Sequence, residues 1–188
     1  MKSAVLCALA TAVFALPSPG QSSEVRADLS AGVARLYHST GLVLGGALMI
    51  PLTATGSVAS RIGPDVQFAY ANVASTGQHR SLLGAGVRYS ADLLANGAVS
   101  PVLGISARYT RASVSNIPTV GLGPQVPPED VTATHYTGWS IGPEGGVRIR
   151  TRRLATMSLI GFVEHQSIYR NASTSTAWGL LLRVGFGL

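Results

Sequence analysis

One short segment of the sequence carries residues that could act together on an acyl ester. His165 and Ser167 stand two positions apart in the segment Glu164-His165-Gln166-Ser167. Successive side chains of a β-strand alternate between two faces, so the histidine and the serine would share a face and Glu164 would lie on the other. A histidine can activate a serine as a nucleophile when an acid orients the ring. The pair is a candidate for ester hydrolysis, and the alternative is two polar residues at the level of lipid headgroups.

A second set of residues places single charges among glycine and serine, at positions that alternate with apolar residues. Inside a narrow barrel, isolated charges are costly, so arginines and carboxylates are expected to pair. The sequence therefore predicts an internal salt-bridge network. Its expected members are Arg88, Asp92, Arg108, Glu144, Arg148, Glu164 and Arg183. The alternative is that these charges are scattered over the solvated face of a soluble barrel.

A third set of residues consists of arginines near the predicted outer ends of strands. Arg80, Arg111 and Arg170 could contact lipopolysaccharide phosphates, because a guanidinium binds phosphate with two hydrogen bonds. The alternative is that they are ordinary loop charges. The histidines near these ends have no metal-binding spacing, so neither a metal nor a cofactor is expected.

The elements that must position these residues are β-strands. From Trp178 to Leu188 every second residue is apolar, which indicates a strand with one continuous apolar face. The same alternation runs through Leu83–Asp92 and Val99–Thr110, and Asn96-Gly97 between them is a tight-turn dipeptide. A proline-rich loop is predicted at 113–130. The predicted strands are 26–37, 41–52, 59–74, 80–92, 98–112, 131–150, 154–169 and 176–188.

The length and composition place these strands in one domain of an exported protein. The apolar run Ala4–Leu16 follows Lys2 and precedes helix breakers, so residues 1–20 are predicted to be a cleaved signal peptide and 21–188 the barrel domain. Cys7, the single cysteine, lies in that signal. The pI is about 10.1, but the arginines are dispersed and no nucleic-acid motif accompanies them. We therefore do not expect nucleic-acid binding.

The balance of apolar and charged residues indicates a membrane. The chain is 46% hydrophobic and only 12% charged, and beyond the signal no apolar run is long enough for a spanning helix. A sheet that closes on itself satisfies its backbone hydrogen bonds and can keep an apolar exterior in lipid. The sequence thus predicts an all-β fold, an eight-stranded antiparallel transmembrane up-and-down barrel. Eight strands leave an interior that side chains fill, so an open pore is not expected.

These features resemble the small eight-stranded outer-membrane barrel proteins, namely the OmpA transmembrane domain, the OmpX proteins and the opacity-type adhesins. The resemblance covers nearly the whole mature chain and includes the ending Phe186-Gly187-Leu188, although the final residue is usually aromatic in that group. Locally, His165 and Ser167 resemble the His-x-Ser pair of outer-membrane lipid A deacylases. Two positions depart from that pattern, because Trp178 stands near the place of the expected glutamate and Ile168 replaces an asparagine.

The resemblance implies an integral outer-membrane protein of a Gram-negative bacterium with a structural or surface-interaction, adhesin-like role. The expected partners are outer-membrane lipid, lipopolysaccharide, the barrel assembly machinery and periplasmic chaperones, with loop 113–130 as the contact site for a surface ligand. Two alternatives remain open. One is a lipid A deacylase-like esterase that uses His165 and Ser167, and the other is a soluble, lipocalin-like periplasmic carrier.

Overall fold

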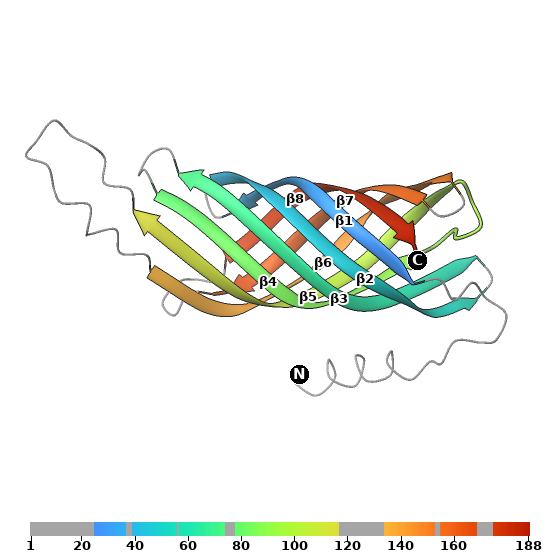
Figure 1. Cartoon of the computed structure of the whole chain (residues 1–188), viewed down its shortest axis with the longest axis horizontal. Coiled ribbons are helices and arrows are strands. Elements are labelled where there is room, and N and C mark those ends of the chain that lie inside the picture. Colours follow the sequence, from blue (N-terminus) through green and yellow to red (C-terminus); the bar gives the residue numbers. More distant parts are fainter. Residues whose placement is uncertain are drawn as a thin grey trace, which may run out of the picture.

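The computed structural model of the chain is a closed barrel of eight antiparallel strands (Figure 1). It describes residues 25–36, 39–55, 57–73, 78–116, 134–152, 155–168 and 175–188. Each strand pairs with its neighbours in the chain, and β1 pairs with β8 to close the barrel. The predicted fold class is therefore confirmed. The strands are β1 (Arg26–Leu36), β2 (Ser39–Thr55), β3 (Val58–Val73), β4 (Gln78–Asp92), β5 (Val99–Asn116), β6 (Thr134–Arg152), β7 (Ala155–Ser167) and β8 (Ser175–Gly187).

The two ends of the barrel differ in their connections. At the terminus end, where β1 begins and β8 finishes, the turn 93–98 joins β4 to β5 (Figure 1). This turn is held by neighbouring strands, since Ala95 N–H donates to the Ser57 carbonyl and Arg150 N–H to the Ala98 carbonyl. The opposite end, here called the loop end, is where β5 finishes and β6 begins. The sequence correctly separated the Asn96-Gly97 turn from the long connection by placing them at opposite ends.

The largest correction to the predicted boundaries is at the start of the long loop. Residues 113–116 belong to β5 rather than to a loop, because they pair with 78–81 of β4 and so complete that strand's ladder. Their serine and asparagine content hid the strand, since polar residues are tolerated where a strand rises beyond the apolar belt. The rest of the predicted loop lies outside the described residues, as do the predicted signal peptide 1–20 and Arg170.

The barrel is apolar outside and largely polar inside. Outward-facing leucines are about half exposed, for example Leu83 at 53%, Leu103 at 56% and Leu159 at 58%. In the closing strand, Leu180 and Leu182 also face outward, whereas Arg183 is 1% exposed and lies inside. A soluble lipocalin-like barrel needs the opposite arrangement, so this distribution contradicts that alternative. None of the described residues forms a helix long and apolar enough to cross a membrane.

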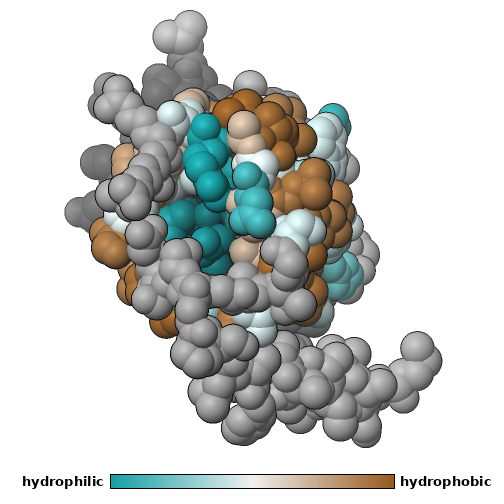
Figure 2. All heavy atoms as spheres, turned by 90° about the vertical axis from the view of Figure 1, so that its right-hand side faces the viewer, coloured by the Kyte–Doolittle hydropathy of each residue, from teal (hydrophilic) through white to brown (hydrophobic). Residues whose placement is uncertain are grey.

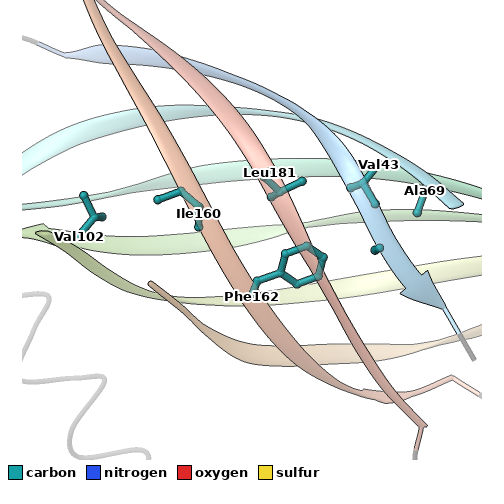
Figure 3. Close-up of a cluster of buried hydrophobic side chains, with 7 residues drawn as sticks. Val43, Ala69, Val102, Ile160, Phe162 and Leu181 are labelled. Carbon is teal, nitrogen blue, oxygen red and sulfur yellow. The ribbon is translucent and has the colours of Figure 1, made fainter. Parts of the chain in front are cut away.

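The interior also contains an apolar cluster that the sequence did not predict. Figure 3 shows these side chains, which come from six of the eight strands. Phe162 is 7% exposed and Leu181 is 3% exposed, so both contribute packing rather than surface. The full cluster is Ala34, Val43, Ala69, Val102, Ile160, Phe162 and Leu181. The interior is therefore mixed, with apolar packing beside the predicted charged residues.

Aromatic side chains on the outer face gather near the strand ends. Tyr70, Tyr109 and Trp178 are exposed toward the loop end, and Phe186 is exposed at the terminus end. Trp139 joins them on β6, also toward the loop end. Bands of aromatic residues at this level are typical of barrels that span a lipid bilayer.

Some neighbouring strands approach so closely that only glycine fits between them. A Cβ atom at Gly142 of β6 would lie 1.9 Å from the carbonyl oxygen of Val163 in β7. By contrast, the nearest atom to a Cβ at Gly161 would be 3.7 Å away, which is ordinary contact. The absence of a side chain at Gly142 thus allows the backbone carrying Glu164 to approach β6.

Candidate functional site

The most highly organised polar site is a chain of six charged side chains that crosses the barrel interior. In it, acids and arginines alternate, and each member forms an ion pair with the next. The order is Glu164, Arg108, Asp65, Arg88, Glu144 and Arg183. We call this set the central ion chain. Because its members come from β3, β4, β5, β6, β7 and β8, it links six of the eight strands across the interior.

The geometry of the central ion chain is that of charge-assisted hydrogen bonding. Arg183 binds Glu144 with two nearly parallel hydrogen bonds, Nη1 to Oε1 at 3.0 Å and Nη2 to Oε2 at 2.8 Å. Arg88 Nε lies 3.8 Å from the same carboxylate, and Arg108 contacts both Asp65 and Glu164. Three acids balance three arginines, so the central ion chain is electrically neutral. Buried charges are tolerated when they are paired in this way.

Asp65 is the central member that the sequence-based prediction missed. Its carboxylate contacts both Arg88 and Arg108, and the residue is 1% exposed. The sequence did contain a signal for its inward position. Gly63, Asp65 and Gln67 share one parity, and the apolar residues Val66 and Phe68 lie on the other. The irregular start of that segment concealed the parity.

Further ion pairs, separate from the central ion chain, lie at the terminus end, and we call them together the terminus-end group. Asp92 binds both Arg148 and Arg61, the latter at 3.0 Å through Nη1. Arg26 binds Asp28 on the same strand, at 2.7 Å from Nε to Oδ1. The structure thus divides the seven predicted charges between two groups. Asp92 and Arg148 belong to the terminus-end group, whose other members, Arg26, Asp28 and Arg61, were not predicted.

The structure keeps His165 and Ser167 on the outer face of β7, but it provides them with no acid from the residues it describes. The ring of His165 lies against Trp139 with a centroid separation of 5.7 Å, and its cross-strand partners are Ile141 and Thr176. Glu164 points inward to Arg108. Within the described ranges, every Asp and Glu side chain is inside the barrel, and each of these residues is no more than 6% exposed. The described residues therefore do not assemble a serine, a histidine and an acid on one face.

The arginines predicted to contact lipopolysaccharide are not gathered into one site. Arg111 is exposed on the outer face of β5, near Tyr109. Arg80 lies on the inner-face parity of β4 and donates to Gln78 Oε1 at 3.3 Å, so the structure does not support an outward contact from it. Arg35, which the sequence did not single out, is exposed on β1 opposite Trp178.

Across the part of the chain that the structure describes, no three His, Cys, Asp or Glu residues could hold a metal ion.

A closed eight-stranded antiparallel barrel with an apolar belt and a charged interior defines a transmembrane β-barrel of the outer-membrane type. The fold is thus that of transmembrane barrels of the bacterial outer membrane, as the resemblance implied. No protein-family model matches the sequence, and no curated protein matches it. Solved structures do match, and their likeness to this chain concerns the fold alone.

The matching structures include Neisserial surface protein A, with a TM-score of 0.60 and 14% identity over 88% of this chain and 96% of that one. A major outer membrane protein from Thermus thermophilus matches with a TM-score of 0.52 and 11% identity, over 87% and 99% of the two chains. The N-terminal barrel domain of Pseudomonas aeruginosa OprF gives a TM-score of 0.47 at 14% identity, over 87% and 97%. The first two matches cover nearly all of each chain, so they share the whole barrel rather than a part of it.

Proposed function

We propose that this protein is a structural and surface-interacting outer-membrane barrel whose interior is closed to diffusion. The observation that carries this proposal is the central ion chain, which connects side chains of six strands across the interior. The apolar cluster around Phe162 and Leu181 fills further space. Eight-stranded barrels have interiors that side chains can fill, so the ion chain and the cluster together support a plug rather than a channel.

Conductance across a planar lipid bilayer tests the closed interior. We expect the reconstituted protein to give no steady conductance above that of protein-free bilayers, because ions would have to displace paired side chains. The double variant Asp65→Ala/Arg108→Ala removes two neighbouring members of the central ion chain. It is expected to give measurable conductance openings. Steady openings of the unmodified protein, at a size set by free diffusion, would contradict the proposal.

The surface-interacting part of the proposal assigns the loop end to the cell exterior. Its support is the asymmetry of the connections, since outer-membrane barrels have short periplasmic turns and longer external loops. The long connection after β5 would then meet a surface ligand, and Arg111 would contact phosphates of the surrounding lipopolysaccharide. No acid accompanies His165 and Ser167 among the described residues, so the deacylase alternative has no geometric support and we do not propose it.

Cysteine labelling on intact cells tests this orientation. Gly123→Cys, in the long connection, is expected to react with a membrane-impermeant maleimide on intact bacteria. Asn96→Cys, in the terminus-end turn, is the matched control and is expected to react only after lysis. The predicted mature region has no native cysteine, so the background is low. Labelling of Asn96→Cys alone on intact cells would reverse the assignment and remove the basis for a surface role.

A further inference from the structure

The terminus-end group contains more positive charge than its carboxylates can balance. Three arginines, Arg26, Arg61 and Arg148, face two aspartates, Asp28 and Asp92, within the described residues. The central ion chain, in contrast, has equal numbers of each sign. A net positive charge inside the barrel, close to apolar walls, favours a compensating anion.

The hydrogen bonds of this group show where the unbalanced charge lies. Arg26 donates two hydrogen bonds to Asp28, from Nε to Oδ1 at 2.7 Å and from Nη2 to Oδ2 at 3.0 Å. Asp92 is shared by Arg61 and Arg148. Arg148 donates from Nε to Ser158 Oγ at 3.2 Å, while its Nη2 group is buried without a hydrogen-bond partner in the protein. Arg61 Nε is likewise buried and without such a partner.

An unpaired donor of Arg148 is significant because this side chain is almost fully buried. The residue is 4% exposed, and a buried charged donor that lacks an acceptor is costly. Arg26 and Arg61, together with Asp28 and Asp92, are near enough to act on Arg148 electrostatically. Three guanidinium groups thus converge on one region, where two of them retain buried N–H groups without a protein acceptor.

The group lies near the terminus end of the barrel. Figure 2 faces the terminus end and shows hydrophilic side chains set back within a surround of hydrophobic ones. Arg26 begins β1 and Asp92 ends β4, so both lie near this end. The central ion chain lies deeper in the barrel. The unpaired donors of the central ion chain, on Arg88 and Arg183, belong to a neutral set, and water can satisfy them without an added charge.

We propose that the terminus-end group binds one small inorganic anion, of the size and charge of chloride, between Arg61 and Arg148. The anion would accept the unpaired N–H groups and would bring the total charge of the group to zero. A narrow, side-chain-filled barrel favours a monatomic anion over a bulky organic one. This site is independent of the surface role proposed above and of the orientation of the barrel.

A chloride titration at constant ionic strength tests the proposal. The full barrel, folded in zwitterionic detergent micelles, would be unfolded with urea while sodium chloride replaces sodium gluconate. A ligand that binds only the folded state raises stability with concentration. We expect the urea midpoint to rise with chloride and to saturate. Arg148→Gln and Arg61→Gln each neutralise the group, so either variant is expected to lose most of this rise.

Arg111→Gln is the matched control, because it removes an exposed arginine on the outer face of β5, near the loop end and away from the group. It should keep the full chloride response. If Arg148→Gln fails to fold, the Arg61→Gln variant and the line width of the chloride-35 NMR signal provide the same test. Folded wild type is expected to broaden that signal more than folded Arg61→Gln.

Three results would overturn the proposal. The first is a wild-type midpoint that does not change with chloride, which would mean that water alone solvates the surplus charge. The second is an equal response in wild type, Arg61→Gln and Arg148→Gln. The third concerns Glu24, which stands two positions before Arg26 in the sequence. A response that appears only in Glu24→Gln would show that a carboxylate from outside the described residues already balances the group.

Discussion

Replacing Asp65 with asparagine is expected to lower the free energy of unfolding of the barrel by about 3–5 kcal/mol. Asp65 is the acid that joins Arg88 to Arg108, and it is almost completely buried. The amide cannot compensate two guanidinium charges, and neither arginine can move into water without opening the sheet. Breaking a buried ionic network from one side leaves the remaining charges unpaired, which is why the expected effect is large.

Urea titration of the barrel in micelles, followed by tryptophan fluorescence or gel mobility, measures this effect. Arg111→Gln is the matched control, since it removes an exposed charge and is expected to change stability by less than about 0.5 kcal/mol. A further variant, Asp65→Asn combined with Arg88→Met, removes a charge of each sign and is expected to recover part of the loss. If Asp65→Asn were as stable as Arg111→Gln, the carboxylate could not be the centre of a buried network.

Replacing Gly142 with alanine is expected to prevent most of the chain from reaching the folded barrel. The new methyl group would lie 1.9 Å from the Val163 carbonyl oxygen, which belongs to the backbone of the neighbouring strand. Relief requires that β6 and β7 separate, and this would disturb the ladder and the position of Glu164. Overpacking of this kind costs about 3 kcal/mol or more at its upper range.

Heat-modifiable migration on gels provides the measurement, because a folded outer-membrane barrel and its boiled form run differently. We expect little of the folded form from Gly142→Ala. Gly161→Ala is the control on β7 and should fold normally, since its nearest neighbour is 3.7 Å from the added atom. Equal folded fractions in the two variants would show that the strands can separate at Gly142 without penalty.

The strands were readily predicted from the sequence, because alternation of apolar and polar residues directly reflects the two faces of a sheet. The same alternation indicated that Arg183 and Glu144 point inward. What alternation does not specify is which inward charges meet. Arg108 reaches Glu164 two strands away, and that contact depends on the register and tilt of the closed barrel.

The errors have related causes. Asp65 was missed because its strand begins irregularly, although its own parity was correct. Arg80 was expected near the outer end of its strand from position alone, whereas its parity places it on the inner face of β4. The start of the long loop was placed too early because Ser113 and Asn116 are polar, yet their backbone groups still pair with β4. In each case local composition was a weaker guide than the pairing of strands.

The seam between β1 and β8 has a consequence for biogenesis. Arg26 pairs with Gly187, so the first strand finds its partner only when the last one is available. Before that moment, β1 and β7 each have an open edge, and open edges are not tolerated in the hydrocarbon region of a bilayer. The central ion chain also lacks Arg183 until β8 is in place. Insertion of this barrel must therefore follow synthesis of the whole chain rather than proceed strand by strand.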